Sequence, residues 1–353
     1  MAKWREALEM LIPPESTVVD LGAGTGILGL LALRAGAAKV YAIERGPMIH
    51  IAAEIAKANG LESRITSIRG MSTEISLPER VDVLVADQIG YFGFNAGAFS
   101  YFDDACRRFL KPGGVTLPRS ITLQCAPVES SENFELADFW NRSPAGFSMG
   151  SAWREAINSG HPAAQISAES LLSRPLESAQ LPLNPPDASL IRIEGDVTIT
   201  RDATLHGLAG FFSAELAPGV SITNSPLAEE RIRRAVSFLP IDRPVPVQLG
   251  DTVSITVLVR PVEMIVSWTV RVNGAMFRHS TFQSIALDVN ANPDISSKPS
   301  LSPRGMAKRF VLERCDGGQT LGAIATALYE AFPAQFPTLS AATAFASRQS
   351  DPS

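Results

Sequence analysis

The sequence of 353 residues has little cysteine, and its three cysteines, Cys106, Cys125 and Cys315, are widely spaced. Because no two of them form a Cys-x-x-Cys pair, the sequence argues against a disulfide framework and against a structural zinc site. None of the four histidines lies at metal-ligand spacing from another histidine or a cysteine, so we predict no metal site. A reducing, cytoplasmic location fits this composition.

Long apolar runs and blocks of basic residues are also missing. The N-terminal segment lacks the apolar core of a signal peptide, and no apolar run approaches the length that spans a bilayer. The 31 basic and 36 acidic residues give a formal net charge of −5, without a basic cluster that would bind a phosphate backbone. We therefore expect neither nucleic acid nor a membrane as a partner. The length favours two or three domains.

Short β-branched runs alternate with helical stretches from residue 17 to about residue 118. This alternation is typical of a parallel sheet covered by helices on both faces. It predicts an α/β, Rossmann-like domain over residues 1–118. The expected strands are 17–21, 39–43, 64–68, 81–86 and 114–117, and the expected helices are 27–36, 48–59 and 97–110.

The composition changes after Pro118. A stretch from about 128 to 186, rich in Ser, Ala and Pro, is expected to be irregular. Alternating apolar and polar residues follow, for example over 253–257 and 267–272, and this period of two is typical of antiparallel strands. We predict a β-rich barrel or sandwich domain over 119–288.

The last part of the chain is expected to be helical. Residues 289–304 are dense in Asn, Ser and Pro and are predicted to be a linker. In the following segment, 305–353, Thr320 is placed to cap a helix whose apolar residues share one face, and Ser340 to cap another. The sequence therefore predicts a short helical segment after the β-rich domain.

A glycine-rich turn, Asp-Leu-Gly-Ala-Gly-Thr-Gly, lies between the first expected strand and the first expected helix. Its glycines, Gly22, Gly24 and Gly26, allow a ligand to approach the backbone and the amides of the helix N-terminus, which is typical of a nucleotide-type pocket. In the register of the dinucleotide fingerprint the third glycine is replaced by Ile27. The turn alone does not decide which nucleotide binds.

Carboxylates beside the turn favour S-adenosylmethionine over NAD. Asp20 would repel a pyrophosphate, whereas it can receive the ammonium of a methionine moiety, directly or through water. Glu44, at the end of the second expected strand and followed by Arg45, can accept both ribose hydroxyls. After the third strand, Met71 is placed to pack on the adenine and the Ser72 amide to bond its edge. The alternative is a tight turn without a ligand, beside a solvated Glu44.

With those residues in place, the chain resembles the protein arginine methyltransferase family over about residues 15 to 285. Beyond the glycine turn, the resemblance rests on the segments 37–44, 89–91, 108–118, 207–212 and 223–226. It implies a class I, S-adenosylmethionine-binding Rossmann-like domain followed by a β-barrel, with S-adenosylhomocysteine as the product. It also implies a homodimer formed through an arm from the barrel, which would lie at about 140–165.

The chain departs from the pattern of that family where the substrate arginine would be held. The family uses two glutamates on one loop; here the first position is Asp87 and the second is Ala96. The Thr-His-Trp loop of the family is also missing, and counting from Pro226 places Arg231 and Arg233 there. A guanidinium needs paired, planar acceptors, so the usual arginine chemistry is not expected.

These departures suggest a neutral or anionic methyl acceptor, such as a carboxylate, a hydroxyl or an imidazole. Arg231 or Arg233 would face an anionic group; the alternative is that both arginines are solvated. Asp87 is the nearest candidate base or substrate orienter, and Tyr91 and Asn95 are candidates for hydrogen bonds to the acceptor. His206 is either a base facing the cleft or a hydrogen-bonded residue of the β-rich domain.

The C-terminal segment from residue 310 resembles, over about 45 residues, the helical half of peptide-recognition domains of the pyrroloquinoline-quinone peptide-chaperone type. This resemblance implies recruitment of a leader peptide. The sequence thus predicts an S-adenosylmethionine-dependent methyltransferase that acts on a peptide or protein side chain. A small-molecule methyltransferase and a non-catalytic cofactor-binding interaction module are the alternatives.

Overall fold

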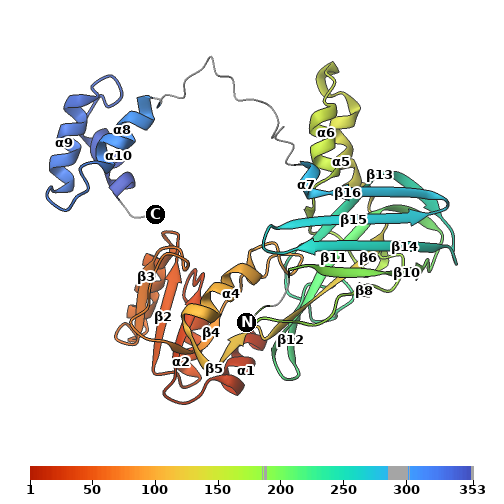
Figure 1. The fold of residues 1–353 in the computed structure, drawn as a ribbon, viewed down its shortest axis with the longest axis horizontal. Helices are drawn as coiled ribbons and strands as arrows, with labels where there is room; N and C mark the ends of the chain where they lie inside the picture. Colours follow the sequence, from red (N-terminus) through yellow and green to blue (C-terminus); the bar gives the residue numbers. More distant parts are fainter. Residues whose placement is uncertain (185, 187–188, 285–300, 302, 351–353) are drawn as a thin grey trace. The chain divides into compact units, whose positions relative to one another are not determined.

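The computed structural model describes residues 1–184, 186, 189–284, 301 and 303–350. The chain divides into two compact units, 1–287 and 288–353 (Figure 1). Most of the predicted linker over 289–304 lies outside the described residues. Within the described part of the chain, no helix combines the length and the apolarity needed to cross a membrane.

The first part of the larger unit contains a five-stranded parallel sheet with the order β3-β2-β1-β4-β5. Its strands are β1 (Thr17–Leu21), β2 (Lys39–Glu44), β3 (Ile65–Arg69), β4 (Val81–Val85) and β5 (Leu110–Leu117). The predicted strands are confirmed, but β5 begins earlier than the sequence suggested. Leu110 pairs with Val81, and the pairing shifts register before Val83 meets Val115, so the strand accommodates Pro112, Gly113 and Gly114.

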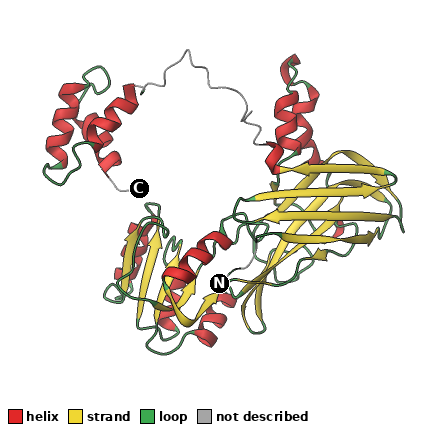
Figure 2. Ribbon diagram, viewed as in Figure 1, coloured by secondary structure: helices red, strands yellow, loops and turns green. Residues whose placement is uncertain are grey.

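Helices follow three of these strands, β1, β2 and β4, and right-handed crossovers are the rule for such connections. Figure 2 shows these helices beside the sheet. They are α2 (Ile27–Arg34), α3 (Met48–Ala58) and α4 (Ala98–Arg108). Because the chain moves outward from β1 to β3 and then in the opposite direction from β4 to β5, α2 and α3 lie on one face of the sheet and α4 on the other. The strand order reverses between β1 and β4, and such a reversal is where open α/β sheets bind ligands.

The second part of the larger unit is built from two antiparallel sheets. One has the order β7-β13-β11-β6-β8, with β12 and β9 paired at its side, and the other has the order β10-β14-β15-β16. In chain order, their strands are β6 (Ser120–Val128), β7 (His161–Ala163), β8 (Leu176–Glu177), β9 (Leu181–Pro182), β10 (Ile191–Thr198), β11 (Ala203–Ala217), β12 (Val220–Thr223), β13 (Val236–Val247), β14 (Thr252–Arg260), β15 (Ile265–Val272) and β16 (Ala275–Ser280).

The two sheets pack face to face as in a sandwich. The buried Trp268 on β15 donates its indole N–H to the Pro240 carbonyl on β13 at 2.7 Å, which links them. Among the described strands, no ladder joins the sheets into a closed barrel. The helix α1 (Ala2–Leu11) packs on α2, β11 and β12, so the parallel sheet and the sandwich share one core.

The stretch from 128 to 186, expected to be irregular, contains two α-helices, α5 (Ser131–Asp138) and α6 (Gly150–Ile157), besides three short 3-10 helices and the strands β7 to β9. The two α-helices project from the sandwich in Figure 1, and we call residues 131–157 the arm. Phe134 and Ile157 are buried in a cluster with Phe211 of β11. Such packing against distant residues stabilises short helices whose Ser- and Pro-rich sequence does not predict them.

The described residues of the smaller unit form three helices, α8 (Pro303–Leu312), α9 (Leu321–Ala331) and α10 (Leu339–Ser350). They enclose an apolar core of their own. The predicted cap of α9 is confirmed, because the Thr320 hydroxyl accepts a hydrogen bond from the Ala323 amide at 3.3 Å. The predicted cap of α10 at Ser340 is wrong, since Thr338 accepts the corresponding bond from the Ala341 amide.

Candidate active site

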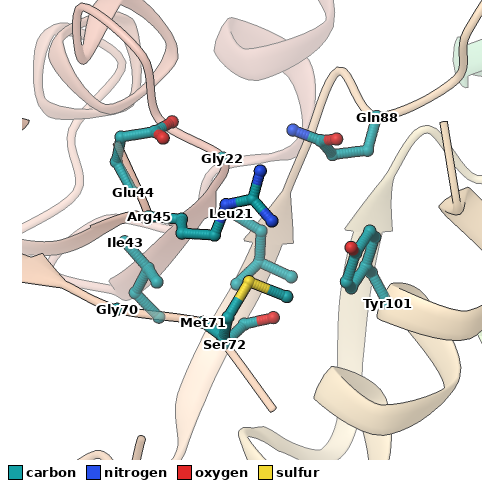
Figure 3. A pocket seen from close by; sticks show the side chains of 10 residues that line it. All are labelled: Leu21, Gly22, Ile43, Glu44, Arg45, Gly70, Met71, Ser72, Gln88 and Tyr101. Atoms are coloured by element: carbon teal, nitrogen blue, oxygen red, sulfur yellow. The ribbon is translucent and has the colours of Figure 1, made fainter. Parts of the chain in front are cut away.

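A pocket of about 200 Å³ lies at the carboxyl ends of β1, β2, β3 and β4, at the reversal of strand order (Figure 3). Its lining residues are Leu21, Gly22, Ile43, Glu44, Arg45, Gly70, Met71, Ser72, Gln88 and Tyr101. The Arg45 guanidinium and the Tyr101 ring extend into it from different sides. The pocket therefore contains the predicted residues Gly22, Glu44, Arg45, Met71 and Ser72. Of the five lining residues that were not predicted, Leu21, Ile43 and Gly70 are their chain neighbours, whereas Gln88 and Tyr101 come from β4 onward and gave no signal in the sequence.

The glycine turn requires backbone conformations that side chains disfavour. Gly22, Gly24 and Gly26 have φ angles of +67°, +53° and +77°, and Gly26 is the N-cap of α2. A Cβ on Gly22 would overlap the amide of the Gln88 side chain. Gly22 is thus necessary for the shape of the pocket, whereas Gly24 and Gly26 shape the turn behind it.

Glu44 is held in place by the backbone around it. Its Oε2 accepts a hydrogen bond from the Gly24 amide at 3.1 Å, and its Oε1 accepts one from the Gly46 amide at 2.7 Å. Each carboxylate oxygen keeps a further lone pair, so this arrangement suits a ligand with two adjacent hydroxyls. The carboxylate is oriented before any ligand binds.

The structure places Asp20 beneath the turn and not on the pocket surface. Its side chain belongs to a residue that is 1% exposed, and its Oδ2 accepts a hydrogen bond from the Gly29 amide in α2 at 2.9 Å. Burial raises the pKa of Asp20 to about 7; the bond from Gly29 opposes this rise, and the charge of Glu44 adds to it. Asp20 therefore fastens β1 to α2 behind the pocket.

Ile27 also lies away from the pocket. Its side chain is exposed on α2, where it lines an apolar groove with Leu31 and Ile55. The Ile27 side chain points away from the cofactor pocket, so a side chain at this position does not block the approach of a ligand to the glycine turn.

The loop after β4, residues 87–97, is stabilised by Asn95. Its Oδ1 accepts hydrogen bonds from the amides of Tyr91 at 2.9 Å and Phe92 at 3.0 Å. Gly90, with φ +74°, permits this turn, because a Cβ there would overlap the Asn95 side chain. Asn95 thus shapes the loop, and the Tyr91 hydroxyl is directed to the Gly160 carbonyl at 3.4 Å. Burial raises the pKa of the Tyr91 phenol.

Asp87, at the start of this loop, pairs with Arg234. The Arg234 Nη2 donates to Asp87 Oδ2 at 2.8 Å, and its Nη1 donates to the Gly90 carbonyl at 3.2 Å. The predicted residues Arg231 and Arg233 are exposed, and Arg231 donates a hydrogen bond to the Ile166 carbonyl at 3.4 Å. The arginine of this segment that pairs with Asp87 is Arg234, which the count from Pro226 did not single out.

Asn224 joins the elements around that ion pair. It is fully buried, and its Oδ1 accepts from the Phe212 amide at 2.9 Å. Its Nδ2 donates to the carbonyls of Tyr91 at 2.8 Å and Ala235 at 2.7 Å. The residue therefore connects β11, the loop 87–97 and the segment that carries Arg234.

His206 lies at the base of the arm and does not face the pocket. Its residue is 7% exposed, and its Nδ1 accepts a hydrogen bond from the Ser130 amide at 3.2 Å. The ring packs on Phe134 of α5, with 5.7 Å between centroids, and burial lowers the pKa of the imidazole. Of the two predicted roles, the geometry matches the hydrogen-bonded residue.

No group of three or more His, Cys, Asp or Glu side chains in the described ranges is arranged to hold a metal ion.

Comparison with known proteins places these features in context. A protein-family model described as "Ribosomal protein L11 methyltransferase (PrmA)" matches residues 5–117. Protein arginine N-methyltransferase 1 of Chlamydomonas reinhardtii is 30% identical over 222 residues, which cover 61% of this chain and 64% of that protein. Protein arginine N-methyltransferase 6 of Xenopus tropicalis is 32% identical over 226 residues, which cover 61% and 66%.

Over these matched regions the chain is similar to protein arginine methyltransferases. Its matches span just under two thirds of the length of these two relatives, 64% and 66%.

Solved structures of this family share the fold. One is the Trypanosoma brucei protein arginine methyltransferase 1 enzyme–prozyme heterotetramer with AdoHcy, with a TM-score of 0.68, 18% identity and coverage of 79% of this chain and 93% of that one. Another is Arabidopsis thaliana protein arginine methyltransferase 10, with a TM-score of 0.66, 21% identity and coverage of 80% and 94%. The predicted Rossmann-like α/β fold followed by antiparallel sheets is confirmed.

Proposed function

We propose that the chain is an S-adenosylmethionine-dependent methyltransferase that acts on a side chain of a peptide or protein and releases S-adenosylhomocysteine. The observation that carries this proposal is the pre-oriented Glu44 carboxylate in a pocket at the β1/β4 reversal. The loop that begins at Asp87 follows directly from the same end of β4. A cofactor site and an acceptor site can therefore adjoin.

The lining residues suit the parts of this cofactor. Glu44 would accept the two ribose hydroxyls, and Met71 and the Ser72 amide would contact the adenine. Asp20 would support the turn from behind and keep Gly22 at the pocket surface. The cofactor supplies a methyl group that is already activated by its sulfonium, so the task of the chain is to position a desolvated acceptor.

In this proposal the methyl acceptor is not an arginine held between two carboxylates. Asp87 is committed to an ion pair, and Ala96 stands where the resemblance places the second glutamate. The names of the relatives make arginine the first alternative acceptor. Two further hypotheses must be separated by an assay: the chain methylates a small molecule in an enclosed pocket, or it binds the cofactor without catalysis.

Titration calorimetry with S-adenosylmethionine and S-adenosylhomocysteine tests the cofactor site, with Glu54→Gln on the exposed side of α3 as a matched control for Glu44→Gln. A labelled-methyl assay on a protein lysate and on its small-molecule fraction tests the reaction. Incorporation of the labelled methyl group into protein supports the proposal. Incorporation only into small molecules means that the acceptor is a small molecule. Binding without turnover on either fraction favours the non-catalytic module, and failure of both cofactors to bind overturns the proposal.

We further propose a homodimer formed through the arm. Its exposed apolar side chains are Leu136, Phe139, Trp140 and Phe147, and α2 and α3 expose an apolar groove that includes Ile27. Mutual burial of these two surfaces would remove both from water. Sedimentation of Phe147→Asp against the unchanged chain tests this: a dimer that persists in the variant contradicts the proposal.

The C-terminal unit is proposed to recruit a leader peptide. It has an apolar core of its own, and a cavity beside Phe336 and Phe345 is bordered by Arg304. Removing residues 300–353 should then weaken the binding of peptide substrates while the affinity for the cofactor stays the same. Unchanged peptide affinity would contradict this role.

A further inference from the structure

The Arg234 guanidinium is held at the acceptor loop by three neighbours. It donates to Asp87 Oδ2 at 2.8 Å and to the Gly90 carbonyl at 3.2 Å, and it lies over the buried Phe212 ring with 5.9 Å to the centroid. A carboxylate, a carbonyl and an aromatic face are the partners that a guanidinium prefers. An arginine of the chain itself therefore occupies the position beside Asp87.

The backbone around Arg234 is fixed. The Ala235 carbonyl accepts from the buried Asn224 amide at 2.7 Å, and the Ile232 amide donates to the Thr223 carbonyl at 2.8 Å. The Arg234 side chain is 26% exposed. This arginine is thus fixed at the loop junction, and part of its side chain is exposed to solvent.

The charges near the acceptor position disfavour a cationic acceptor. Glu229 and Glu230 are exposed on the same segment and balance the exposed Arg231 and Arg233. Asp87 is neutralised by Arg234, and Ala96 supplies no second carboxylate. A cationic acceptor would have to compete with Arg234 for a single carboxylate.

We infer that the methyl acceptor is a carboxylate of a peptide or protein and that Arg234 determines this specificity by binding it; the inference rests on the proposed methyltransferase function. A guanidinium has five N–H donors, and the bonds to Asp87 and Gly90 use two of them. The others remain for one oxygen of an acceptor carboxylate. The second oxygen is then free to accept the methyl group.

A hydroxyl, an imidazole and a carboxylate make different chemical demands on this site. A hydroxyl must lose a proton, but the nearest base, Asp87, is tied to Arg234. An imidazole would acquire positive charge next to the guanidinium as it is methylated. A carboxylate needs no base and loses its negative charge.

The transfer to a carboxylate balances without a further reactant. A lone pair of the carboxylate oxygen forms the new O–CH₃ bond, while the S–CH₃ bond breaks and its electron pair stays on sulfur. The product is a neutral methyl ester and a neutral thioether, and no proton moves. Arg234 holds the acceptor and is not changed in the reaction.

The test measures labelled methyl groups on a peptide library rich in aspartate, isoaspartate and glutamate, beside an arginine-rich library and a copy of the first with its carboxyls amidated. Methyl esters release methanol in mild alkali, whereas N-methyl groups do not. We expect alkali-labile label on the acidic library only. We also expect Arg234→Gln to raise KM for these peptides by roughly 10–100-fold, the size of a lost charge-assisted contact, with a smaller change in kcat.

Arg260→Gln, an exposed arginine at the end of β14, is the matched control and should leave KM unchanged. Arg234→Lys keeps the charge without the planar fork, so it should recover part of the affinity. Alkali-stable label, label on the amidated library, or esterification that Arg234→Gln leaves unaltered would each overturn the inference. So would a protein that binds cofactor but labels none of the libraries. Failure of the proposed function is distinct, since calorimetry would then show no cofactor binding.

Discussion

The cofactor pocket and the acceptor loop lie at the same end of the parallel sheet but are held together in different ways. In the pocket, Glu44 is fixed by amides 20 and 2 residues away, and Asp20 by an amide 9 residues away. At the acceptor loop, Arg234 and Asp87 are 147 residues apart, and Asn224 and Tyr91 are 133 apart. The pocket is therefore a local construction, whereas the acceptor loop depends on the docking of the sandwich onto the sheet.

Replacing Asn224 by Ala should have the largest effect, because it should destabilise the acceptor loop without altering the cofactor pocket. The change removes three hydrogen bonds from a buried position and leaves backbone groups of Phe212, Tyr91 and Ala235 without their partner. We expect the free energy of unfolding to fall by about 3 kcal/mol, because unpaired buried groups are costly. Denaturant unfolding measures this, with Asn59→Ala, an exposed residue with one hydrogen bond, as the control. Cofactor affinity below the unfolding transition should stay within about threefold, less than the 1.4 kcal/mol of a tenfold change; a larger loss would show that the two regions are not separate.

The next largest effect is the pH dependence of stability from Asp20. Its folded pKa is raised from 3.8 to about 7, so between these values the folded protein binds a proton that the unfolded chain has lost. The contribution is most favourable below pH 4 and declines as the pH rises towards 7. Between about pH 5 and 7 the wild-type chain should lose about 2 kcal/mol relative to Asp20→Asn. Parallel stability curves for the two proteins across this range would contradict the assigned burial.

Glu44→Gln sharpens the comparison from the pocket side. It retains the size of the side chain but removes the charge that receives the ribose hydroxyls. We expect S-adenosylmethionine to bind about tenfold more weakly, in line with the loss of a charge-assisted hydrogen bond. The glutamine keeps one acceptor oxygen, so one of the two backbone bonds from Gly24 and Gly46 is lost, and the free energy of unfolding of the ligand-free protein should fall by about 1 kcal/mol. Unaltered affinity in calorimetry would mean that Glu44 only supports the turn.

The smallest effect is expected for Tyr91→Phe. The hydroxyl makes one long hydrogen bond, 3.4 Å to the Gly160 carbonyl, so its removal should cost about 0.5 kcal/mol of stability. Steady-state kinetics should show kcat within about threefold of the unchanged enzyme, because the hydroxyl is directed away from the acceptor. A much larger fall in kcat would give the Tyr91 hydroxyl a part in the reaction.

The same contrast explains what the sequence could predict. The strands, the glycine turn and the position of Glu44 can be predicted because each depends on residues that are close in the chain. The structure has β1, β2 and β4 where the sequence pattern predicted them. The helices of the arm were missed because their stability comes from Phe134 and Ile157 packing on β11. Arg234 was missed because Arg231, Arg233 and Arg234 are equivalent by composition, and only the contacts of the folded segment distinguish them.

Gln88 and Asp87 are adjacent residues with different neighbours. Gln88 lines the cofactor pocket beside Gly22, and Asp87 holds Arg234. A ligand that moves the Gln88 side chain therefore acts on the peptide unit that positions Asp87. Thermodynamic linkage makes such an effect reciprocal, so an acceptor that binds at Arg234 changes cofactor affinity by the same factor as the cofactor changes acceptor affinity. The strength of this coupling then depends on the peptide unit that joins Asp87 to Gln88.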